Sequence, residues 1–164
     1  MSTSPGRSRG LIASLGLIAH PEGGYYREVY RSPTSVKPSD RRESRSALTT
    51  IYFLLTQGQF SRWHRVQSDE VWHFYEGATL DLWLTSPEIS LVEHHRLGAP
   101  EAVPQPVLVV PAGWWQAARS SGVYTLTGCT VGPGFEFEDF ALAADEPASA
   151  EAFRQLGDQT AALL

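Results

Sequence analysis

Residues 58–77 read GQFSRWHRVQSDEVWHFYEG, and this stretch decides the fold. Residues 61–66 (SRWHRV) and 70–75 (EVWHFY) alternate polar and apolar side chains, which is typical of half-buried β-strands. Residues 67–69 between them are polar and predict a turn. If the two strands pair as a hairpin across this turn, the residues that flank it lie close together.

The alternation also assigns side chains to faces, because residues two apart on a strand point the same way. His64 therefore shares a face with Val66, and Glu70 shares one with Trp72 and Phe74. In the hairpin, His64 and Glu70 approach each other at its mouth.

Similar segments continue on both sides of this stretch. They are short, rich in β-branched and aromatic residues, and separated by Gly, Pro, Ser or Asp. Eight closely spaced strands predict an all-β sandwich or barrel rather than a helical bundle. The predicted strands are 47–56, 61–66, 70–76, 79–85, 89–95, 107–111, 115–119 and 123–131.

The ends of the chain differ from this centre. Residues 1–8 are expected to be a disordered tail, and a short helix is expected over about 9–16. A second helix is expected over 147–157, with Ser149 as its N-cap. With 164 residues the chain is expected to form one domain, whose barrel covers about 23–142.

Two charged stretches lie outside the strands. Residues 33–45 are polar and are expected to form a long exposed loop with Arg41, Arg42 and Arg45 in solvent. Glu136, Glu138 and Asp139 are expected to form a solvated acidic edge.

Composition limits the function. The net charge is −5 with no basic cluster along one face, so no nucleic-acid partner is expected. No apolar run has transmembrane length, so no membrane partner is expected. Cys129 is the one cysteine of the chain, which suits a reducing, cytoplasmic location and excludes a disulfide within the chain.

The central stretch resembles the first motif of the cupins, at Gly58, His64, Glu70 and Gly77, with Val66 where a second histidine is usual. Residues 111–120 (PAGWWQAARS) resemble the second motif at Pro111 and Gly113, with Gln116 at its histidine position.

Longer segments carry a finer resemblance, to the cupin-5 family, formerly a domain of unknown function. They are HPEGGYYREVYRS (20–32), FSRWHRVQSDEVWHFYEG (60–77), VPAGWWQAA (110–118) and GCTVGPGFEFEDFAL (128–142). The resemblance implies a double-stranded β-helix (jelly-roll) barrel, a homodimer, and a shape like that of the dTDP-deoxysugar epimerases.

These residues predict a pocket. His64 and Glu70 are the candidate catalytic residues, because a carboxylate inside an apolar barrel is costly unless it has a partner, and such a pair suits proton transfer. The candidate ligand-binding residues are Gln116, Trp72, Phe74, Trp63 and Tyr52, with Tyr75 and Tyr124 as further candidate proton donors.

No cofactor is expected. A cupin metal site normally uses three histidines and one glutamate, and only His64 and Glu70 remain here. Should a divalent metal bind, His64, Glu70 and Gln116 would hold it weakly, because an amide oxygen is a weak ligand.

Three functions stay open at this point. One is a metal-independent isomerase or epimerase with His64 as general base and Glu70 as its partner. The second is a non-catalytic pocket for a small metabolite, and the third is a weakly metal-dependent enzyme. The expected ligand is a small molecule, either a sugar nucleotide or a keto compound.

Overall fold

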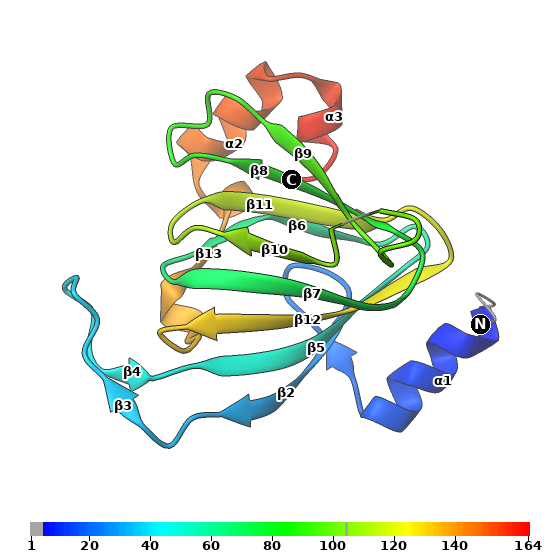
Figure 1. Ribbon diagram of the computed structural model, residues 1–164. Helices are drawn as coiled ribbons and strands as arrows, with labels where there is room; N and C mark the ends of the chain where they lie inside the picture. Colours follow the sequence, from blue (N-terminus) through cyan, green and yellow to red (C-terminus); the bar gives the residue numbers. More distant parts are fainter. Residues whose placement is uncertain (1–4, 104) are drawn as a thin grey trace.

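Two antiparallel sheets face each other and enclose most of the core, as the computed structural model shows for residues 5–103 and 105–164 (Figure 1). The six-stranded sheet runs β1 (Ile18–Ala19), β2 (Tyr25–Arg31), β5 (Thr49–Thr56), β12 (Tyr124–Gly132), β7 (Asp69–Gly77) and β10 (Val107–Val110). The five-stranded sheet runs β13 (Phe140–Leu142), β6 (Phe60–Val66), β11 (Trp115–Ser120), β8 (Leu80–Thr85) and β9 (Glu93–Leu97). The all-β prediction is confirmed.

The predicted hairpin of residues 61–75 does not form. β6 and β7 lie in different sheets: β6 pairs with β11 and β13, and β7 pairs with β12 and β10. The chain turns a corner between the sheets at Gln67 and Ser68. His64 and Glu70 therefore face each other across the interior rather than along one ladder.

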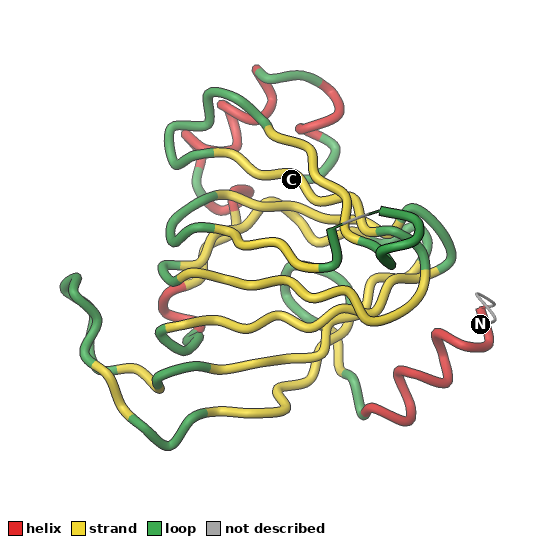
Figure 2. Tube along the Cα trace, viewed as in Figure 1, coloured by secondary structure: helices red, strands yellow, loops and turns green. Residues whose placement is uncertain are grey.

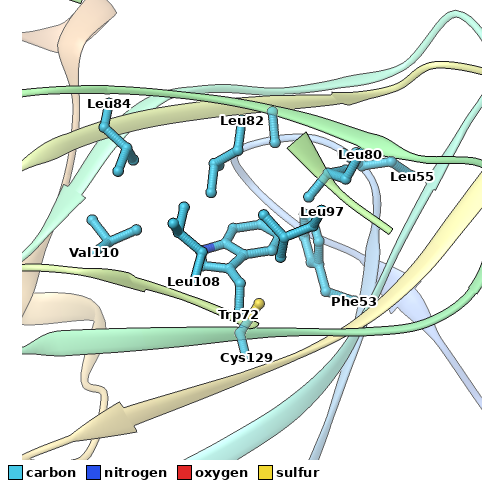
Figure 3. Close-up of a cluster of buried hydrophobic side chains, with 11 residues drawn as sticks. Phe53, Leu55, Trp72, Leu80, Leu82, Leu84, Leu97, Leu108, Val110 and Cys129 are labelled. Atoms are coloured by element: carbon cyan, nitrogen blue, oxygen red, sulfur yellow. The ribbon is translucent and has the colours of Figure 1, made fainter. Parts of the chain in front are cut away.

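One part of the interior is solidly filled. Trp72 lies at its centre and contacts Phe53 edge-on, with ring centroids 5.6 Å apart. Leucines from β8, β9 and β10 close over the indole (Figure 3). Packing of this kind is the main source of stability in a two-sheet fold.

The outer faces of both sheets are partly covered by helices. The helices α2 (Pro147–Gln155) and α3 (Asp158–Ala161) lie beside the five-stranded sheet, and α1 (Pro5–Leu15) lies at one end of the six-stranded sheet (Figures 1 and 2). Phe153 of α2 stacks on Trp63 with centroids 4.3 Å apart. Leu11 of α1 packs in a cluster with Leu54 and Tyr124.

Several predicted boundaries differ from the structure. The first helix begins at Pro5, inside the predicted tail, and residues 1–4 lie outside the described part of the chain. The strand predicted over 89–95 begins only at Glu93, and Ile89 has a φ of 52°. Ser149 lies within α2, whose N-cap is Glu146 and whose first residue is Pro147.

The two charged stretches are also organised differently. The short strands β3 (Ser35–Val36) and β4 (Arg45–Ser46) pair at the two ends of the predicted loop, and a 3-10 turn, η1, covers Phe137–Asp139. Arg45 and Asp139 are buried and form an ion pair, with 2.8 Å from Arg45 Nε to Asp139 Oδ2. The predictions of a solvated Arg45 and a solvated Asp139 are therefore wrong.

None of the helices among residues 5–103 and 105–164 is long and apolar enough to cross a membrane.

Candidate functional site

Beside the filled core, the space between the sheets opens into a cavity of about 130 Å³. Alternate residues of β2, β5, β12 and β7 point into it, in the register that the strand pairing sets. These wall residues are Tyr26, Glu28, Ile51, Phe53, Cys129, Val131 and Glu70. His64 and Val66 of β6 line the opposite side, so the predicted sharing of a face by His64 and Val66 is found.

A tight turn at residues 20–24 adds two further groups to the cavity, His20 and Glu22. Gly23 and Gly24 follow, with φ of 112° and 71°. A side chain at Gly23 would collide with the carbonyl of Phe60, and one at Gly24 would lie 2.8 Å from the carbonyl of Leu54. Glycine is therefore required for the turn to approach both sheets and to place Glu22 against β6.

Glu22 and His64 form the central polar pair. His64 Nε2 lies 3.2 Å from Glu22 Oε2. On the other side of the ring, Nδ1 lies 2.8 Å from the backbone oxygen of Arg62. A carbonyl only accepts hydrogen bonds, so Nδ1 carries the proton and Nε2 is the nitrogen free to exchange a proton with Glu22.

Burial changes the pKa of both partners. Loss of solvent raises the pKa of Glu22 and lowers that of His64, because each charged form is poorly solvated there. Ser61 Oγ donates to Glu22 Oε1 at 2.8 Å and fixes the carboxyl group in place. Burial thus makes Glu22 hold its proton to a higher pH, and His64 lose its proton at a lower pH, than the free side chains.

Glu70 is the second buried acid. Burial raises its pKa, and the nearby negative charge of Glu22 raises it further, while His64 lowers it. Gln116 Nε2 donates to Glu70 Oε2 at 2.6 Å, and Gln116 Oε1 accepts from Trp72 Nε1 at 2.8 Å. Both ends of the Gln116 amide are therefore occupied, and it orients Glu70 rather than facing the cavity.

Aromatic rings form the remaining wall. Phe140 of β13 stacks on His64 with centroids 5.5 Å apart, and Phe137 stacks on His20 at 6.1 Å. Tyr26 meets His20 edge-on at 4.5 Å. Both histidines are thereby held between the sheet and the segment that follows β12.

The structure separates the other candidate residues from the cavity. Trp63 points away from it and packs against α2, and Tyr52 packs in the cluster beneath α1. Trp72 and Phe74 belong to the filled core. Tyr75 contacts Tyr52 and Tyr124 donates to Glu76, so the tyrosine in the cavity wall is Tyr26.

Comparison with known proteins agrees with this architecture. The family described as "Cupin superfamily (DUF985)", Cupin_5, matches residues 9–143. The chain belongs to this cupin family. No curated protein matches its sequence.

Solved structures give the same result. A protein of Shewanella oneidensis is 37% identical, with a TM-score of 0.75 over 87% of this chain and 85% of its own. A hypothetical protein from Leishmania major is 29% identical, with a TM-score of 0.77 over 92% of this chain and 98% of its own. Oxalate decarboxylase from Bacillus subtilis is 13% identical, with a TM-score of 0.58 over 86% of this chain and 34% of its own, and shares the fold alone.

The residues of this cupin do not fit the usual metal site of the superfamily. Val66 offers no ligand atom, and Gln116 Oε1 is committed to the Trp72 indole. His64 Nε2 faces Glu22. No group of three His, Cys, Asp or Glu side chains in the described chain is arranged to hold a metal ion.

Sequence reasoning missed His20 and Glu22. His20 lies in a loop and lines the cavity. The signal was present in the segment HPEGGYY, where an acid is followed by two consecutive glycines.

Proposed function

We propose that this cupin is a metal-independent acid–base enzyme of the isomerase type, acting on a small carbonyl compound. The observation that carries the proposal is the buried pair of Glu22 and His64 beside a second buried acid, Glu70, in one cavity. Groups whose pKa values are shifted by burial at a cavity wall are typical of proton-transfer sites.

The proposed reaction moves one proton. The Glu22–His64 pair starts with Glu22 ionised and Nε2 of His64 unprotonated. It removes a proton from the carbon next to the carbonyl, and His64 Nε2 is the final acceptor. The C–H electron pair forms a C=C bond, and the carbonyl electrons move to oxygen. Glu70, which keeps its proton to a higher pH than a free glutamic acid, donates a hydrogen bond to this oxygen. Return of the proton to the same carbon regenerates the carbonyl compound, and its return to the opposite face of that carbon completes an epimerisation.

Gln116 acts through Glu70 in this scheme. Its amide fixes one carboxyl oxygen of Glu70, and Cys129 is a further hydrogen-bond partner of this carboxyl group. Trp72 in turn fixes the amide, so the filled core positions the acid.

The test is proton exchange in D₂O. The purified protein is incubated with cyclohexanone, hydroxyacetone, pyruvate and phenylpyruvate, and NMR follows deuterium entering next to the carbonyl. We expect exchange for at least one compound, with a loss of roughly 100-fold or more in H64Q and E22Q. The control is H94Q, which changes an exposed histidine on β9.

Two results would contradict the proposal. One is no exchange above the buffer rate with any compound. The other is full exchange in H64Q and E22Q variants that melt normally.

A non-catalytic binding cupin is the second candidate. The aromatic wall of Phe137, Phe140 and Tyr26 favours it, because such a wall binds a ring without any chemistry. It predicts binding without exchange. The homodimer expected from the sequence stays a prediction, which light scattering at micromolar concentration tests.

A further inference from the structure

We infer that the cavity selects uncharged, ring-sized ligands and rejects anions, so that its occupant is a cyclic or similarly compact ketone or alcohol rather than a phosphate or carboxylate. The expectation that the ligand carries a carbonyl group rests on the proposed function. The selection against charge has separate evidence, at the cavity mouth.

Arg31 is the arginine that lines the cavity, and its guanidinium group is already occupied. It binds both carboxyl oxygens of Glu28 at 3.1 and 2.9 Å and Glu136 Oε1 at 2.6 Å. A fourth N–H donates to the backbone oxygen of Phe135 at 3.1 Å. A guanidinium has five N–H donors, so one remains for a ligand.

The charges at the mouth sum to a negative value. One arginine faces two carboxylates, Glu28 and Glu136, which themselves line the cavity. A phosphate or carboxylate that approached Arg31 would find a single free N–H and would lie beside both carboxylates. Sites that bind such anions usually present an arginine fork or backbone N–H groups free for the ligand.

The interior offers an anion no better partner. Its cationic candidates are His20 and His64, and loss of solvent lowers the pKa of both. Glu22 and Glu70 stand beside them, so a buried anion would meet two acids in a poorly solvated space. An uncharged ligand avoids this cost and still finds hydrogen-bond partners.

The size of the cavity limits the ligand to about one ring. Its volume of about 130 Å³ is close to the roughly 150 Å³ of an engineered apolar cavity that binds benzene. A nucleoside diphosphate sugar carries two phosphates and several rings. Both size and charge therefore disfavour the sugar nucleotide that the sequence resemblance suggested.

A matched ligand series tests the charge selection. Cyclohexanone, cyclohexanol, cyclohexanecarboxylate and cyclohexylammonium share one ring and differ in polar group and charge. Ligand-observed NMR at pH 7.5 measures their affinities for the full chain. We expect the ketone and the alcohol to bind at least tenfold more tightly than the carboxylate. Equal or tighter binding of the carboxylate or of the ammonium would overturn the inference.

A second variant tests the role of Arg31. E28Q removes one of the two carboxylates and frees part of the guanidinium. We expect it to raise the affinity for cyclohexanecarboxylate several-fold more than the affinity for cyclohexanol. The control is E151Q, an exposed acid on α2. An unchanged carboxylate affinity in E28Q would show that Arg31 does not set the charge selection.

The two proposals fail separately. Tight binding of uncharged rings without deuterium exchange would leave the charge selection intact and overturn the acid–base function. Exchange of pyruvate or phenylpyruvate, with no exchange of the uncharged ketones, would leave the acid–base function intact and overturn the charge selection.

Discussion

Asp139 and Glu22 are equally buried acids, each 6% exposed, yet their pKa values shift in opposite directions. Asp139 accepts hydrogen bonds from Arg45 and from Arg42, and these hold its pKa below the usual range. Among the described residues, no arginine or lysine side chain is hydrogen-bonded to the Glu22 carboxyl group, and burial raises its pKa. Equal surface exposure therefore does not fix the direction of the shift: hydrogen bonds from arginine lower the pKa of Asp139, and loss of solvent raises that of Glu22.

The two acids also do different work. Asp139 ends the turn η1, directly before Phe140, which stacks on His64. The ion pairs of Asp139 thus hold the aromatic wall in place, and they contribute stability. Glu22 and Glu70 are held without an arginine or lysine side chain in hydrogen-bond contact within residues 5–103 and 105–164, and burial makes both keep their protons to a higher pH.

The largest effect is expected at Asp139. In D139N, buried Arg45 loses its carboxylate partner, so the free energy of unfolding at pH 7 should fall by about 3 kcal/mol. Urea unfolding of the purified variant measures this. The control is D40N, which removes an exposed partner of Arg42 and should change the free energy of unfolding much less than D139N, because water screens this pair.

The pH dependence of the stability difference between wild type and D139N tests the direction of the pKa shift of Asp139. Because the folded pKa of Asp139 lies below its unfolded value near 3.8, its stabilisation is complete above that value and is lost as the pH falls through the folded pKa. The difference between wild type and D139N should be constant from pH 5 to 8 and shrink below about pH 4. A difference that grows toward low pH would contradict the account.

At Glu70, a substitution is expected to change the free energy of unfolding less, and in the opposite direction. E70Q keeps the hydrogen bond to Gln116 and removes the acid, so stability at pH 8 should rise by about 1 kcal/mol. The folded pKa lies above the unfolded value of 4.5, so wild type and E70Q should agree below about pH 4.5 and separate as the pH rises. Urea unfolding between pH 4 and 8 checks this, and a loss of stability at pH 8 would show that the carboxylate is paired after all.

The smallest effect is expected at Glu136. Its pair with Arg31 is largely solvent-exposed, with 36% and 45% of the two side chains accessible. E136Q should change the free energy of unfolding by less than about 0.5 kcal/mol, because water screens such pairs. A change above about 1 kcal/mol would mean that this exposed pair also anchors the segment after β12.

The sequence predicted the fold and part of the site because both depend on local patterns. Alternation in residues 58–77 was enough to place His64 and Glu70 on interior faces. The same alternation did not reveal that β6 and β7 lie in different sheets, since a corner and a hairpin need similar polar residues.

The features that the sequence did not predict depend on contacts between residues that lie far apart in the chain. Glu22 reaches His64 only because two glycines let their turn approach both sheets. Asp139 is buried only because Arg45 returns to it from a position 94 residues earlier. Trp63 is covered by α2, near the end of the chain. The alternation of residues in β6 alone therefore could not show which face of the strand points away from the cavity.

The central claim is that burial raises the pKa of Glu22 and Glu70, whereas arginine partners lower the pKa of Asp139. Carbon-13 NMR of protein labelled at the side-chain carboxyls of Glu and Asp measures this directly, with E22Q, E70Q and D139N to assign the signals. The account predicts that Glu22 and Glu70 titrate above 4.5 and that Asp139 titrates below 3.8. Titration of Glu22 and Glu70 at or below 4.5 would contradict it.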